Sequence, residues 1–146
     1  MAKRLTMKEA APDSYRAMAG LERFVSQSGV NPLHLEMIKN RASIINGCAY
    51  CIDMHTRKAR SLGETEQRIY ALAAWRESPL FTDEERAMLA LTDEITRIGR
   101  HGVSDEVYVN ITKYFNEQLI AGIIMAIVTI NAWNRIMVAT QMVFEE

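Results

Sequence analysis

The chain has 146 residues, of which 49% are apolar and 24% are charged, and its formal net charge is −1. A domain of this size buries roughly 70% of its unfolded surface, so it can build a hydrophobic core without disulfide or metal support. Its interspersed charges argue against nucleic-acid binding, and residues 1–6 do not resemble a secretory signal, so we expect a cytoplasmic protein.

Helix signals recur along the chain, whereas strand signals do not. Capping residues such as Asp13, proline at first helical positions and glycine stops together predict seven helices. Their approximate bounds are 13–28, 31–45, 48–62, 65–78, 82–98, 104–115 and 116–143. We therefore predict an all-α fold, in which residues 1–146 form a single-domain bundle of about six to seven helices.

The last predicted helix carries the longest apolar run, from Leu119 to Ile130. A membrane span needs about 20 such residues, so this run indicates a buried helix and no membrane partner. Because it is apolar nearly all round, it must lie centrally in the domain or against another subunit. A domain of this size has little interior in which to hide it, so we expect a homo-oligomer.

Polar residues interrupt the same helix after the apolar run, at Asn131, Asn134 and Arg135. Buried polar groups need hydrogen-bond partners, so we expect a network there. Such a network would support either the helix that carries the cysteines or a subunit interface.

The only two cysteines, Cys48 and Cys51, lie three residues apart, and His55 follows four residues later. At about 100° per helical residue, all three share one face of a helix. Gly47 places Cys48 near the start of that helix, where free backbone N–H groups favour a thiolate. A thiolate attacks peroxide to give a sulfenic acid, which a second thiol condenses into a disulfide. The pair is therefore a complete two-electron redox unit.

Three other interpretations of the cysteine pair remain open. Structural zinc sites usually take four protein ligands, whereas this motif offers two cysteines and His55, with His34 and His101 distant in sequence. A thioredoxin-like domain also uses two cysteines at this spacing, but it needs strands. In the third interpretation the cysteines are small core residues and the histidine lies on the surface.

The residues Glu36, Cys48, Cys51 and His55 follow the pattern Glu-x11-Cys-x2-Cys-x3-His. This pattern resembles the AhpD-like alkylhydroperoxidases of the carboxymuconolactone decarboxylase superfamily. The segments 41–56 and 130–135 resemble the same family, and the resemblance covers roughly residues 15–140.

The resemblance implies a thiol-dependent peroxidase that reduces hydroperoxides and assembles into trimers or hexamers. In that scheme Cys51 attacks the peroxide, and Cys48 resolves the sulfenic acid and exchanges with an external dithiol. His55 and Glu36 relay protons. The reductant would be a lipoylated or thioredoxin-like protein, and we expect no cofactor or metal. The cysteine pair argues against the decarboxylase branch of the superfamily, which lacks it.

Two alternatives to a peroxidase come from other functional classes. The cysteine pair could exchange disulfides with a protein, or act in a redox-sensing adaptor, without significant peroxide turnover. The chain could also be an oligomeric or ligand-binding module that keeps the motif without catalysis.

Two features of the motif conflict with these roles. The start of the helix favours a thiolate at Cys48, whereas the resemblance assigns the attack to Cys51. Twelve residues of unbroken helix would also place Glu36 about 18 Å from Cys48. Either the chain turns sharply at Asn46-Gly47, or the glutamate comes from elsewhere in an assembly.

Overall fold

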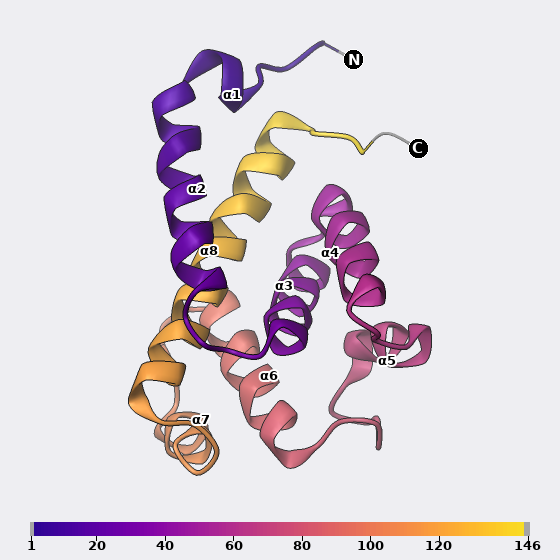
Figure 1. Ribbon diagram of the computed structural model, residues 1–146, viewed down its shortest axis with the longest axis vertical. Coiled ribbons are helices and arrows are strands. Elements are labelled where there is room, and N and C mark those ends of the chain that lie inside the picture. The colour runs from indigo at the N-terminus through magenta and orange to yellow at the C-terminus, as the bar shows by residue number, and fades with distance from the viewer. Residues whose placement is uncertain (1, 145–146) are drawn as a thin grey trace.

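The computed structural model describes residues 2–144, which form eight α-helices and one 3₁₀ helix, with no strand among them (Figure 1). The all-α prediction is confirmed, and six of the seven predicted helices are present within four residues of their expected ends. The helix predicted over residues 65–78 is shorter and divided, with an α-helix over 66–71 and a 3₁₀ helix over 72–74. The additional element is a four-residue first helix. In chain order the elements are α1 Met7–Ala10, α2 Pro12–Ser26, α3 Pro32–Asn46, α4 Ala49–Ser61, α5 Glu66–Ala71, η1 Leu72–Ala74, α6 Asp83–Thr96, α7 Asp105–Ile111 and α8 Glu117–Thr140.

Most helices begin at the capping residues that the sequence predicts. Asn31, Thr82, Ser104 and Asn116 each accept a backbone N–H bond at their helix start, and Thr82 forms a full capping box. The predicted cap at Asp13 is wrong. Helix α2 begins one residue earlier at Pro12, because proline has no N–H to satisfy and its fixed φ suits the first helical position.

Helix α3 lies at the centre of the bundle, packed against α4, α6 and α8 (Figure 1). Helix α2 runs alongside α8 on the outside of the bundle. Within residues 2–144, α8 is the one helix long and apolar enough to cross a membrane by length and composition. It packs against the other helices of the bundle, although only 44% of its most apolar window is buried, and side chains such as Val128 and Val138 stay exposed.

A close crossing fixes α8 against the connection between α2 and α3. A Cβ atom added at Gly122 would lie 2.9 Å from Ser28 Cβ and 3.0 Å from Val30 Cγ2. Such separations are too short for any side chain larger than hydrogen. Glycine at this position therefore lets the two segments touch.

A buried ion pair joins the central helix α3 to α6. Arg41 Nε and Nη2 donate to the two carboxylate oxygens of Asp93 at 2.7 and 3.1 Å, and the Trp75 indole donates at 3.2 Å. Burial alone raises the pKa of Asp93, but hydrogen bonds from Arg41 and Arg76 outweigh burial and hold that pKa below its usual value. The pair holds the middle of α3 against α6, and α3 also carries Glu36.

Candidate active site

The chain turns sharply between α3 and α4, which is the first of the two possibilities that the motif left open. Gly47 has φ +65°, in the left-handed region that glycine adopts without strain, and it ends α3. The Cys48 N–H then donates to the Ser43 carbonyl at 3.0 Å. This turn lays α4 beside α3, so residues that are distant along a continuous helix become neighbours (Figure 1).

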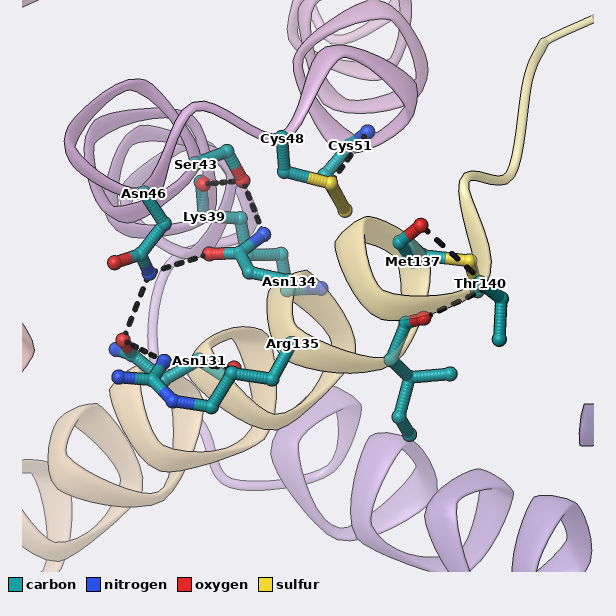
Figure 2. Close-up of a disulfide and its surroundings, with 11 residues drawn as sticks. Lys39, Ser43, Asn46, Cys48, Cys51, Asn131, Asn134, Arg135, Met137 and Thr140 are labelled. Carbon is teal, nitrogen blue, oxygen red and sulfur yellow. Dashed lines mark hydrogen bonds between the residues drawn. A yellow bond between two sulfur atoms is a disulfide. The ribbon is translucent and has the colours of Figure 1, made fainter. Parts of the chain in front are cut away.

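The two cysteines form a disulfide at the start of α4 (Figure 2). Cys48 is the N-cap residue, and its Sγ accepts the Cys51 backbone N–H at 3.3 Å. Helix N-terminal N–H groups stabilise negative charge, so this position favours a thiolate at Cys48 in the reduced protein. Cys48 is fully buried, and Cys51 is 3% exposed.

His55 and Glu36 meet across the α3–α4 contact. His55 Nδ1 lies 2.8 Å from Glu36 Oε2, and Asn40 Nδ2 donates to the His55 carbonyl at 3.0 Å. With an ionised Glu36 accepting, Nδ1 carries the hydrogen, which leaves Nε2 free to take or give a proton. Glu36 therefore reaches the motif within one chain, and no second subunit is needed to supply it.

Two further charged residues continue this chain of contacts, and the sequence motif missed both of them. Lys39 Nζ lies 3.6 Å from Glu36 Oε1 and 3.5 Å from Glu22 Oε2. Lys39 and Glu36 are 8% and 5% exposed, and charges buried to this degree are usually paired. The spacing of Lys39 from Glu36 suits neighbours on a helix, but nothing in the sequence places Glu22 of α2 beside them.

Cys51, His55 and Glu22 line a cleft of about 290 Å³. The remaining lining residues are apolar or aromatic and come from α2, α4 and α8: Tyr15, Tyr50, Met54, Trp133 and Met137. Cys48 is not a lining residue, so the two sulfurs differ in their access to a ligand. The cleft places one cysteine, the histidine and the Glu22 carboxylate against an otherwise apolar and aromatic surface.

The predicted polar network on α8 is present, and it supports the turn before the cysteines (Figure 2). Asn46 Nδ2 donates to the side-chain oxygens of Asn131 and Asn134, at 2.9 Å in both cases. Asn134 Nδ2 in turn donates to Ser43 Oγ at 3.0 Å. These bonds fix the end of α3, and with it the start of α4, against α8.

The arrangement suits thiol chemistry more than metal binding. Within residues 2–144, no three His, Cys, Asp or Glu side chains are grouped so that they could hold a metal ion. The disulfide, the imidazole and an apolar cleft instead supply a two-electron redox pair, a proton carrier and a place for an organic ligand.

The sequence model of the Carboxymuconolactone decarboxylase family matches residues 12–94, which include both cysteines and His55. The chain belongs to this family. Its relatives include the uncharacterized protein YdfG of Bacillus subtilis, 43% identical over 139 residues and 95% of each chain. Another is the uncharacterized protein YnjA of Escherichia coli, 29% identical over 67% of this chain and 52% of YnjA.

Solved structures place this family member among the AhpD-like folds. A protein of unknown function from Agrobacterium tumefaciens, provisionally described as the antioxidant defence protein AhpD, is 39% identical, with a TM-score of 0.96 over 99% of both chains. An AhpD core protein from Ralstonia eutropha matches at a TM-score of 0.84 and 19% identity, over 96% of this chain and 75% of that one. The debrominase Bmp8 matches at 0.79 and 20% identity, over 94% and 73%. The last two show the fold alone.

Proposed function

We propose that this carboxymuconolactone decarboxylase family member is a thiol-dependent peroxidase that reduces organic hydroperoxides through a Cys48–Cys51 dithiol/disulfide cycle. The observation that carries the proposal is that Cys51 and His55 line the same largely apolar cleft, while Glu36 is hydrogen-bonded to Nδ1 of the imidazole. An apolar cleft suits the organic part of a hydroperoxide, and the polar pair suits its reacting oxygens.

In the first step the Cys51 thiolate attacks the terminal oxygen of the hydroperoxide, and the O–O bond breaks. Cys51 becomes a sulfenic acid, and the leaving alkoxide takes a proton to become the alcohol. His55 is the proton donor in this scheme, and the Glu36 carboxylate holds its ring in the required orientation.

In the second step the Cys48 thiol condenses with the sulfenic acid, which forms the disulfide and releases water. The two Cα atoms lie 5.3 Å apart, within the range that disulfides require. An external dithiol then reduces the disulfide, so the net reaction converts a hydroperoxide and a dithiol into an alcohol, water and a disulfide.

The burial of Cys48 supports a different reduction step from the expected one, in which Cys48 exchanges with the external dithiol. Cys51 is the sulfur that faces the cleft, so it is the one that the incoming thiolate attacks. Cys48 then leaves as a thiolate that the helix N-terminus stabilises, and a stabilised leaving thiolate departs faster. The helix start, which favours a thiolate at Cys48, thus acts in the reduction step, whereas Cys51 attacks the peroxide in the first step.

The test is peroxide consumption by single-cysteine variants. Cys51→Ser should abolish it, whereas Cys48→Ser should consume one equivalent and leave a sulfenic acid that dimedone traps and mass spectrometry detects. The opposite pattern would exchange the roles of the two sulfurs. A reduced wild-type protein that reacts with peroxide no faster than free cysteine would contradict the peroxidase proposal and favour protein disulfide exchange or a redox-sensing adaptor.

The proposal also includes the setting in which the enzyme works. We infer a cytoplasmic homo-oligomer, a trimer or a hexamer, whose reductant is a lipoylated or thioredoxin-like protein. The exposed apolar side chains on α8 support the oligomer, since a second subunit would remove them from water. A peroxidase assay with lipoyl, thioredoxin-type and glutathione reductants would identify the electron donor.

A further inference from the structure

A second apolar pocket adjoins the Cys51 cleft. It has a volume of about 250 Å³ and lies where α1 and α2 meet α8. Its lining residues are Met7, Ser14, Tyr15, Ala17, Met18, Leu21, Trp133 and Ile136. Tyr15 and Trp133 also line the cleft, so the two hollows lie on either side of this aromatic pair.

The aromatic pair, Tyr15 and Trp133, lines both hollows. The two rings meet edge to face with centroids 5.3 Å apart, and both side chains are half-buried. Helix α2, which carries Tyr15, has a single buried residue, Val25, near its C-terminal end. Because the N-terminal half of α2 has no buried side chain, Tyr15 can move without disrupting the core.

We propose that the second pocket is a subsite for the hydrocarbon tail of a long-chain, uncharged hydroperoxide whose peroxide group lies at Cys51. The inference rests on the proposed peroxidase function and names its substrate class. The lining of the second pocket is mostly aliphatic and aromatic, with the hydroxyls of Ser14 and Tyr15, the indole N–H of Trp133 and no cation, so it suits an alkyl chain and offers no charged partner to an anionic one.

The sizes and composition of the two hollows support a single extended ligand. Each is slightly smaller than the usual range for organic-ligand sites, roughly 300–1,000 Å³, whereas the two together lie within it. Methionines line both, Met54 and Met137 in the cleft and Met7 and Met18 in the second pocket. Methionine side chains adapt to ligands of varied shape, as a flexible alkyl chain requires.

The experiment compares n-butyl and n-octyl hydroperoxides, which differ by four methylene groups at one end of a linear chain. Burying one methylene is worth roughly a factor of four in binding. Burial of two of the four extra methylenes already gives about 16-fold, so we expect kcat/KM for the octyl compound to exceed that for the butyl compound by roughly tenfold or more. Equal values for both compounds would overturn the subsite while leaving the peroxidase function in place.

A filled pocket and a matched control test the location. Ala17→Phe places a ring in the second pocket and should remove most of the octyl-to-butyl ratio. Ala19→Phe makes the same change on the same helix, at an exposed residue that lines neither hollow, and should keep the ratio. A ratio that responds equally to both variants, or to neither, would contradict the proposal.

Binding of the alcohol product tests the subsite independently of peroxide reduction. Calorimetric titration of the oxidised protein with 1-octanol should show binding that Ala17→Phe weakens on the order of tenfold and Ala19→Phe does not. This outcome would support the subsite even if no hydroperoxide were turned over. Octanol binding that Ala17→Phe does not weaken would overturn it, whatever the peroxidase assay shows.

Discussion

At the residue scale, the two cysteines of one short motif have different surroundings. Cys48 caps α4 and is sealed inside the protein, whereas Cys51, three residues later, lines a cleft with His55. Helical geometry requires only that they share a face. The difference arises because Cys48 packs in a buried cluster with Ala42 of α3 and Ile130 of α8, whereas a hollow that Trp133 and Tyr15 border lies beside Cys51.

The Glu36–His55 contact leads to a prediction about catalysis. Glu36→Gln keeps the shape of the side chain but removes the carboxylate that orients His55 and pairs with Lys39. Positioned proton transfer is worth roughly 10²- to 10⁴-fold, so we expect kcat/KM for peroxide to fall within that range. Stopped-flow measurement of disulfide formation is the readout.

A carboxylate elsewhere in the same region provides the control. Asp53 forms a surface ion pair with Arg57 on α4, so Asp53→Asn removes the same charge without touching His55. It should keep the wild-type rate. If Asp53→Asn slowed the reaction as much as Glu36→Gln does, a change in net charge would explain the effect better than the loss of the carboxylate bonded to His55.

At the element scale, the site depends on how α3, α4 and α8 are held together. The left-handed Gly47 reverses the chain, and the asparagine network fixes that reversal to α8. The N-terminal half of α8 is held by the close contact between Gly122 and Ser28. These contacts position α8, whose Trp133 and Met137 form one wall of the cleft.

The crossing at Gly122 leads to a prediction about stability. Gly122→Ala forces a methyl group against Ser28, and overpacking of this kind costs about 1–3 kcal/mol. Gly20→Ala on α2 meets nothing within 4 Å and should stabilise its helix by about 1 kcal/mol. Urea unfolding should therefore give a lower unfolding free energy for Gly122→Ala than for Gly20→Ala. Equal values would show that the crossing is looser than its geometry indicates.

At the scale of the whole molecule, the buried Arg41–Asp93 pair links stability to pH. Because the folded-state pKa of Asp93 lies below its usual value of 3.8, the pair stabilises the protein fully above that value. Its contribution is lost as the pH falls through the lower, folded-state pKa. Asp93→Asn leaves the Arg41 charge buried without its partner and should cost about 3–5 kcal/mol at pH 7.

Urea unfolding of wild type and Asp93→Asn over a pH series checks this prediction. The difference in unfolding free energy should be constant near neutral pH and should shrink only below about pH 3.8. The surface variant Asp53→Asn should change stability by less than about 1 kcal/mol at any pH. A difference that disappears already between pH 7 and pH 5 would assign the effect to another group.

The exposed side of α8 leads to a prediction about assembly. Less than half of the most apolar window of this helix is buried within one chain, so we expect a second chain to cover part of the rest. Light scattering coupled to size exclusion should give three or six times the 16.6 kDa chain mass. Val128→Lys, at an exposed residue on that helix, should lower the measured mass of the assembly. A wild-type protein with the mass of a single chain would refute the assembly.

Much of the fold could be predicted because its signals are local. Caps at residues such as Thr82 and Asn116, and the glycine at residue 47, act within one turn of chain, so the sequence predicts the helix ends that they set. Helix α1 was missed because its N-cap, Thr6, makes no side-chain cap bond and its four residues bury nothing. The cap at Asp13 was misplaced because Pro12 can open the helix one residue earlier.

The sequence by itself determined the helical class, the cysteine pair at a helix start and the break between two helices at Asn46-Gly47, since spacing and backbone preference act between near neighbours. Only the tertiary structure decided that Glu36 reaches His55, that Lys39 joins it to Glu22, and that Cys51 and not Cys48 faces the cleft. These contacts join three helices, and which faces meet depends on how every side chain of the core packs at once.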